Sequence, residues 1–179
     1  MIQSRYSAVA MALHWITALI IIAFLIFGEN MIDDEHGGTD FTRALHVSLG
    51  LLVLVLTLAR LFWRFANPPP ALPATMKGWE VKLSKVSHTV FYLLMLALPL
   101  TGWLAASAVS VEDNIIFTVL GGMILPLAAV ANLGELLPEA HSLAGNVMIA
   151  LLALHVLAAL KHQFIDKDNL LARIVPRMR

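Results

Sequence analysis

Residues 140–160 read AHSLAGNVMIALLALHVLAAL, an uncharged apolar run that carries His141 near its start and His155 near its end. A run of about 20 apolar residues is long enough to cross a bilayer as an α-helix. At about 1.5 Å of rise per residue, the two histidines lie about 21 Å apart and project from nearly the same helix face. Ionisable residues inside a bilayer are costly, so both histidines are candidates for a functional site.

Three further runs have similar length and composition. Together with the first, the four predicted spans are about 8–28, 44–65, 86–111 and 140–160. The 44–65 run ends with Arg60 and Arg64, whose long side chains can reach the headgroups. With 59% hydrophobic residues, 13% charged residues and a mean hydropathy of +0.81, the chain lies outside the range of soluble domains. We therefore predict an all-α membrane protein, a four-helix up-down bundle formed by residues 1–179 as a single domain.

Residues 114–134 form one more uncharged stretch, but Gly121, Gly122 and Pro126 interrupt it. We interpret 112–138 as a loop that lies in the outer membrane interface. The first span is too long for a cleavable signal and has no small-x-small cleavage site. The chain has no cysteine, so it can form no disulfide and no covalent thioether bond to a cofactor.

The charged residues are sorted by side although the net charge is zero. Basic residues occupy the N-terminus, the second connection and the C-terminal tail. The first and third connections are acidic, with Arg43 their only cation. The positive-inside rule therefore predicts that both termini lie in the cytoplasm.

Depth along the predicted helices sorts four histidines into two pairs. His14 and His155 each lie about 9 Å inside the cytoplasmic boundary, at about 1.5 Å per residue. His46 and His141 lie about 4.5 Å and about 3 Å inside the outer boundary on the same scale. The spacing predicts two sites, one near each leaflet.

Haem iron suits such sites, because neutral imidazole is a good iron ligand and brings no unpaired charge into the membrane. Gly50 and Gly145 each follow a histidine of the outer pair by one turn, where a missing side chain lets a flat macrocycle approach the backbone. Arg60 lies on the same face as His46 but at the inner level, where it can pair with haem propionates. The plainer alternative is that such histidines only form hydrogen bonds between helices.

The other histidines have less clear roles. His88 lies about one turn inside the third span, and His162 lies at the boundary beside Lys161. We interpret both as candidates for a quinone or a propionate rather than for iron. His36 is expected to face solvent in the acidic loop. Aromatic residues are common at helix ends, which is where Trp15, Trp63, Trp79 and Trp103 are found.

Motifs along nearly the whole chain resemble those of the bacterial cytochrome b561 family. They are Tyr6-Ser7, Leu13-His14-Trp15, Leu45-His46-Val47-Ser48-Leu49-Gly50, Arg60-Leu61, Asn67-Pro68-Pro69-Pro70, Leu98-Pro99-Leu100-Thr101-Gly102, His141, Leu154-His155 and Lys167-Asp168-Asn169-Leu170-Leu171. The resemblance implies a di-haem b-type cytochrome of the bacterial inner membrane. It implies that His14 and His155 hold the inner haem and that His46 and His141 hold the outer haem.

Two histidines on each iron leave no open position, so these haems are expected to pass single electrons, with no catalytic residue at the iron. The resemblance further implies oxidation of superoxide at the outer face and reduction of ubiquinone. A quinone site near the inner haem would use His88, Lys161 or His162, with Trp15 against the ring.

Two other functions stay open at this point. One is a haem b membrane anchor that takes electrons from a dehydrogenase or hydrogenase partner, although the short loops and tail offer little docking surface. The other is a helical bundle without a cofactor. The expected partners are membrane lipid, quinone and a redox donor, with no nucleic acid, and the sequence leaves open whether two copies associate.

Overall fold

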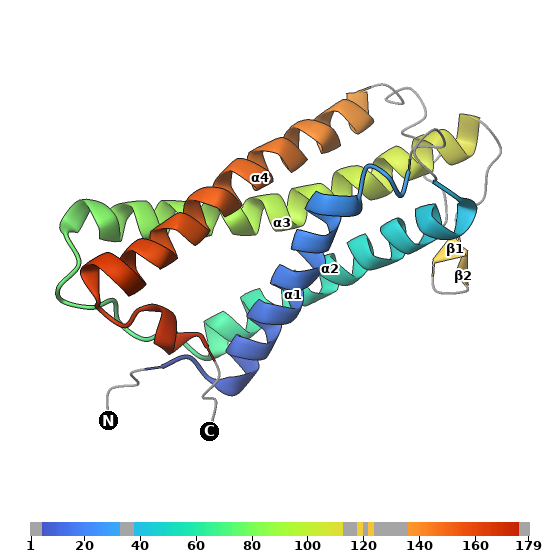
Figure 1. Cartoon of the computed structure of the whole chain (residues 1–179). Coiled ribbons are helices and arrows are strands. Elements are labelled where there is room, and N and C mark those ends of the chain that lie inside the picture. The colour runs from blue at the N-terminus through green and yellow to red at the C-terminus, as the bar shows by residue number, and fades with distance from the viewer. Residues whose placement is uncertain (1–4, 33–37, 113–117, 120–121, 124–135, 176–179) are drawn as a thin grey trace.

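The computed structural model describes residues 5–32, 38–112, 118–119, 122–123 and 136–175. Four long helices dominate it (Figure 1): α1 (Ala8–Phe27), α2 (Asp40–Ala66), α3 (Gly78–Glu112) and α4 (Leu136–Lys161). Each is long and apolar enough to cross a membrane, which confirms the predicted four-helix membrane fold.

The helix starts follow from capping side chains. The Ser7 hydroxyl accepts a hydrogen bond from Ala10 N and so caps α1. Thr39 and Thr42 form a reciprocal capping box that starts α2 at Asp40, four residues before the predicted span. Such hydroxyl caps satisfy the first N–H groups of a helix, which have no partner within it.

Helix α3 begins eight residues before the predicted span. Its first turns carry Glu80, Lys82 and Lys85, so this part of the helix has the polar character expected outside the hydrocarbon core. Pro99 lies within α3 and has no N–H to donate to the preceding turn.

The predicted 112–138 loop lies largely outside the described residues. Within its described part, β1 (Thr118–Val119) and β2 (Gly122–Met123) form a short antiparallel pair, and α4 begins at Leu136. This local pairing of two-residue strands leaves the four-helix architecture unchanged.

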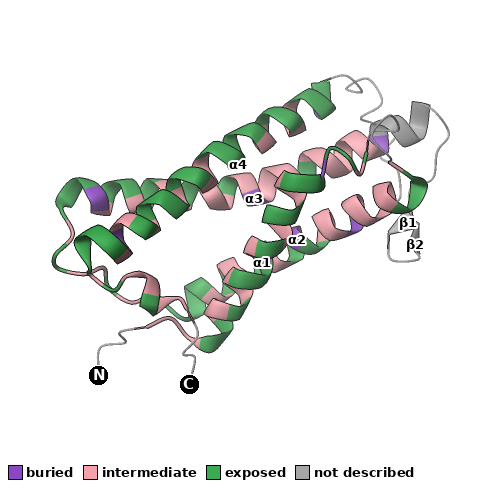
Figure 2. Cartoon of the chain, viewed as in Figure 1, coloured by how far each residue is buried: buried purple, intermediate pink, exposed green. Residues whose placement is uncertain are grey.

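The helices pack in chain order, α1 on α2, α2 on α3 and α3 on α4, whereas α4 and α1 make few direct contacts. Many residues of the four helices are exposed (Figure 2), and many of these are large and apolar, as expected for helices that face lipid. The most buried positions include Thr17, Thr57 and Ser107, whose hydroxyls donate to carbonyls of the preceding turn. Small residues of this kind let membrane helices approach closely.

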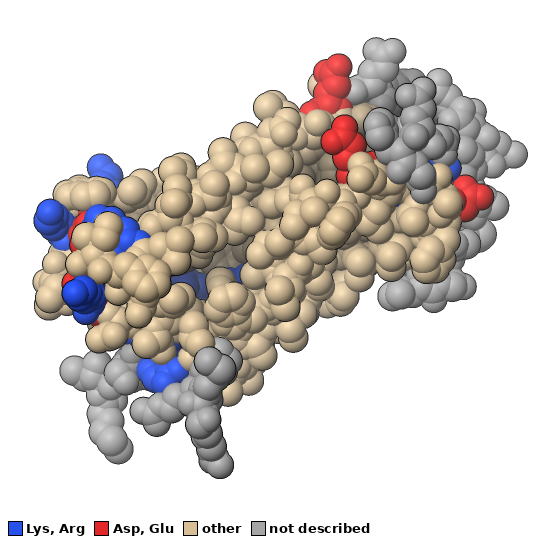
Figure 3. Space-filling view, in the orientation of Figure 1, with Lys and Arg blue, Asp and Glu red and all other residues tan. Residues whose placement is uncertain are grey.

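Both termini lie at one end of the bundle (Figure 1). We call it the terminal end and the opposite one the far end. At the terminal end, Tyr6 N donates to the carbonyl of Arg173 (3.1 Å) and the Trp15 indole donates to the carbonyl of Ile174 (3.0 Å). After α4 the chain makes a π-helical turn, η3 (His162–Asp166), and a 3-10 turn, η4 (Leu171–Arg173). Lys and Arg side chains gather at the terminal end (Figure 3), and acidic side chains dominate the visible far end.

Candidate functional site

Two histidines from different helices meet near the far end of the bundle. The ring centres of His46 on α2 and His141 on α4 are 6.2 Å apart, and the ring planes are inclined by 62°. A ring nitrogen of histidine lies about 2 Å from a bound metal. The separation of the two ring centres is therefore compatible with two histidines that share one metal atom.

The orientation of His141 is set by α3. Its Nδ1 lies 3.0 Å from the carbonyl oxygen of Leu98 and 3.2 Å from Oγ1 of Thr101. The Thr101 hydroxyl also lies 2.8 Å from the Ala97 carbonyl, to which it donates. A proton on Nδ1 that points at a carbonyl leaves Nε2 with the lone pair that a metal needs.

Two glycines allow the helices to approach these rings. A Cβ on Gly102 would lie 3.0 Å from Cε1 of His141. A Cβ on Gly28 would lie 2.5 Å from the Phe24 carbonyl oxygen of its own helix end and 3.3 Å from Cε1 of His46. Neither glycine was predicted to belong to the site. The Leu98-Pro99-Leu100-Thr101-Gly102 motif was the only sequence feature that pointed to Gly102, because the sequence does not show which helix faces the histidine.

His46 is enclosed by apolar and aromatic groups. The ring of Phe24 on α1 lies against it, with the ring centres 4.7 Å apart. Its Nδ1 is buried, and the described part of the chain offers it no hydrogen-bond partner. An orphaned ring nitrogen in such a site fits a histidine whose partner is a bound group.

A second cluster lies nearer the terminal end and contains three histidines. The rings of His88 and His155 are 5.9 Å apart and perpendicular, and Phe91 lies 5.2 Å from His155. His14 on α1 lies near both histidines. The Nδ1 of His88 donates to the carbonyl of Ser84 (2.6 Å), so its Nε2 is also available as an acceptor.

Arg60 joins this cluster from α2. Its guanidinium lies 3.3 Å from Nδ1 of His14 and 3.8 Å from the sulfur of Met95, and 5.6 Å above the ring of Tyr92. Within the described residues no carboxylate pairs with it. A largely buried cation without an anion is costly, so the site suits an anionic ligand.

The predicted glycines Gly50 and Gly145 face open space. A Cβ on either would meet no other atom within 4 Å in the described structure. Paired histidines, an internal arginine with no carboxylate partner among the described residues, and glycines with open space beside them suit a b-type haem with its two propionates. The residues present therefore fit that group.

Residues 5–177 match the family described as prokaryotic cytochrome b561. The chain belongs to the prokaryotic cytochrome b561 family. It is 31% identical over 179 residues to a probable superoxide oxidase CybB of Yersinia pestis, covering 99% of each chain. It is 30% identical to cytochrome b561 homolog 1 of Escherichia coli strain K12, over 99% of this chain and all of that one. It is also 30% identical to a cytochrome b562 of Cereibacter sphaeroides, over 97% and 96% of the two chains.

Membership in this family establishes the class of activity and the location. This cytochrome b561-family protein is an oxidoreductase that transfers electrons across the bacterial inner membrane by means of b-type haem. Four membrane-spanning helices agree with a multi-pass protein.

The other residues that the sequence singled out in this cytochrome b561-family protein lie at the terminal end or outside the described residues. Trp15 contacts His14 edge-on, with ring centres 5.3 Å apart. Lys161 is ion-paired with Glu80 (2.9 Å) and Asp166 (2.5 Å). His162 is buried, and His36 lies outside the described residues.

Proposed function

We propose that the protein carries electrons from superoxide at the outer face to ubiquinone at the cytoplasmic side. The observation that carries the proposal is the presence of two histidine clusters at different levels of one helical bundle. The name of the relative from Yersinia pestis supports superoxide as the donor. The basic terminal end supports a cytoplasmic location of both termini.

In this proposal two b-type haems occupy the two clusters. His46 and His141 hold the outer haem, and His14 and His155 hold the inner one. Bound haem supplies iron that alternates between the ferric and ferrous states and so passes one electron at a time. Arg60 neutralises propionate charge, and Gly50 and Gly145 leave the backbone open to the macrocycle.

His88 has a different role in the proposal although it touches His155. Its contact with His155 supports a position beside the inner haem, near which a quinone headgroup would bind. Lys161, His162 and the doubly protonated form of His88 are the candidate hydrogen-bond donors to the quinone oxygens, with Trp15 against the ring. Two superoxide anions give one electron each, and the quinone takes both electrons with two protons to become the quinol.

The acidic far end is unfavourable for attracting an anion such as superoxide. Arg43 is the cation on that side; its Nη1 lies 3.4 Å from Asp40, and its Nε donates to the carbonyl of Ile32 (3.2 Å). We infer that Arg43 and the edge of the outer haem provide the local positive potential that the donor meets.

A spectrum and a mixing experiment test the proposal. The purified protein should show a reduced-minus-oxidised b-type spectrum with two haems per chain. Stopped-flow mixing with superoxide should reduce the haem, and a short-chain ubiquinone should then reoxidise it. A stoichiometric iron–sulfur partner that co-purifies, with no direct reaction with superoxide, would instead support the membrane-anchor function.

A further inference from the structure

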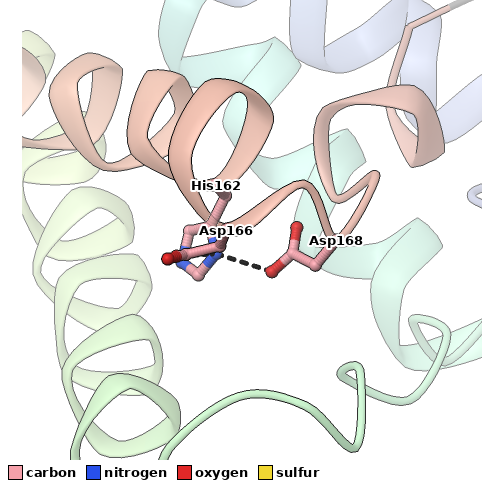
Figure 4. Close-up of side chains that lie close together, drawn as sticks. All are labelled: His162, Asp166 and Asp168. Carbon is pink, nitrogen blue, oxygen red and sulfur yellow. Dashed lines mark hydrogen bonds and ion pairs between the residues drawn. The ribbon is translucent and has the colours of Figure 1, made fainter.

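The chain after α4 brings two carboxylates onto one buried imidazole. Figure 4 shows His162 with Asp166 and Asp168 close to it. Nδ1 of His162 lies 2.7 Å from Oδ2 of Asp168 and 3.2 Å from Oδ2 of Asp166. The π-helical turn η3 carries His162 and Asp166, and such turns are rare and often occur at functional sites.

The backbone adopts an unusual conformation to place Asp168. Lys167 and Asn169, on either side, both have left-handed φ angles of 53° and 58°. Residues other than glycine seldom adopt this conformation, and it persists where surrounding contacts impose it. Here Asp168 N donates to the His162 carbonyl (3.3 Å), and Leu170 N donates to Oδ1 of Asp168 (3.0 Å). The Lys167-Asp168-Asn169 motif thus fixes a carboxylate against His162.

Asp166 and Asp168 also line a polar cavity of about 210 Å³ at the terminal end. Glu80 and Lys77 from the start of α3 contribute to the same cavity. Lys161 pairs with both Glu80 and Asp166 and so ties α3 to the turn. His162 lies behind these groups with 7% of its surface exposed, so the carboxylates stand between the cavity and the ring.

We propose that His162 and Asp168 form a proton relay that brings protons from water in this cavity to the quinone. The inference rests on the proposed function, because it assumes quinone reduction at the terminal end. A proton from water in the cavity reaches Nδ1 of His162 through Asp168, while the ring gives the proton on Nε2 to a quinone oxygen as the electrons arrive. The Asp168 carboxylate stabilises the positive charge on the ring during this transfer, and the ring is left neutral with its proton on Nδ1.

His162, Asp166 and Asp168 are also side chains of the types that bind a divalent metal ion. The ammonium group of Lys161 lies 2.5 Å from Oδ2 of Asp166, however, so a metal ion would have to displace this ion pair to use that oxygen.

The test uses the full-length, haem-loaded protein, reduced chemically and then mixed without oxygen with either a short-chain ubiquinone or ferricyanide. Ferricyanide takes electrons without protons. Asp168→Asn should slow reoxidation by ubiquinone at least about tenfold and leave ferricyanide reoxidation unchanged. The expected loss is smaller than the about 10²- to 10⁴-fold contribution of a proton-transferring group itself, because the His162 imidazole is retained. The solvent deuterium isotope effect on the ubiquinone reaction should rise in the variant. Asp168→Glu should restore part of the rate.

The variant keeps the turn, because an asparagine at position 168 can still accept the hydrogen bond from Leu170 N. Glu139→Gln is the control: it removes an exposed carboxylate at the other end of α4 and should leave both rates unchanged.

Several outcomes would overturn the relay. One is an unchanged ubiquinone rate in Asp168→Asn, and another is an equal loss with both oxidants. A ubiquinone rate in the unmodified protein that falls on addition of a chelator would show a metal site instead. If ubiquinone fails to reoxidise the unmodified protein while ferricyanide succeeds, the proposed function itself fails, and the relay fails with it.

Discussion

Gly102 and His141 are in such close contact that a Cβ added to the glycine would lie 3.0 Å from Cε1 and 3.2 Å from Nδ1 of the imidazole. Nδ1 of the same ring is held by the Leu98 carbonyl and the Thr101 hydroxyl. Three residues of one α3 motif therefore determine where a histidine of α4 points. In bis-histidine ligation this kind of support fixes the metal-binding nitrogen.

Gly102→Ala should displace His141 and perturb the outer haem. The ring is fixed by its hydrogen bonds, so it cannot move away from the new methyl group without losing them. We expect a haem content that falls toward one per chain, or a shifted spectrum of one haem, measured by pyridine haemochrome assay and low-temperature absorption. Gly78→Ala is the control, because an added Cβ there meets nothing within 4 Å. A normal spectrum of Gly102→Ala would contradict the constraint.

Gly50→Ala and Gly145→Ala test whether the macrocycle covers these glycines. An added Cβ meets no other described atom within 4 Å at either position. Replacement of glycine by alanine within a helix is by itself stabilising by up to about 1 kcal/mol. We therefore expect the thermal stability of the haem-free protein to be unchanged or raised, while haem affinity falls. Full haem affinity in both variants would place the macrocycle elsewhere.

Five single histidine variants separate the iron ligands from their neighbours. His46→Ala and His141→Ala should remove one haem, and His14→Ala and His155→Ala should remove the other, because each iron then loses an axial ligand. His88→Ala should retain both haems but slow reoxidation by ubiquinone. The haem content per chain of each variant distinguishes the iron ligands from their neighbours. Loss of a haem in His88→Ala, with full content in His14→Ala, would exchange the roles of these two residues.

Arg60→Gln should lower the midpoint potential of one haem. Removal of a positive charge near the iron favours the ferric form, and each tenfold change in that preference corresponds to about 59 mV for one electron. A spectroelectrochemical titration should show a shift of tens of millivolts in a single component. Arg64→Gln, at an exposed position one turn further along α2, should leave both potentials in place. Equal shifts in the two variants would mean that Arg60 has no special proximity to a haem.

Arg43→Gln should reduce the rate of haem reduction by superoxide without changing reduction by dithionite at saturation. The guanidinium supplies positive potential at an otherwise acidic end of the bundle, and the attraction between charges is screened by salt. The rate for the unmodified protein should therefore fall as ionic strength rises, and the variant should show a weaker dependence. A rate that is insensitive to both changes would exclude Arg43 from the donor site.

The sequence by itself determined the membrane fold and the relative depth of the histidines. Both depend on one-dimensional quantities, because the length of an apolar run decides whether it spans the bilayer, and the rise per residue places each histidine along its helix. Four membrane-spanning helices were predicted, and the described part of the chain contains four helices that are long and apolar enough to span a membrane. The predicted proximity of His46 and His141 also agrees with the described geometry.

Only the tertiary structure decided how each helix is rotated about its axis and which helix it faces. That rotation places Gly102 and Thr101 against His141, Gly28 against His46, and the ring of His88 beside His155. The contact between Asp168 and His162 likewise depends on a π-helical turn and two left-handed residues that no periodicity predicts. Such contacts arise from packing between distant segments, so sequence spacing within one helix does not contain them.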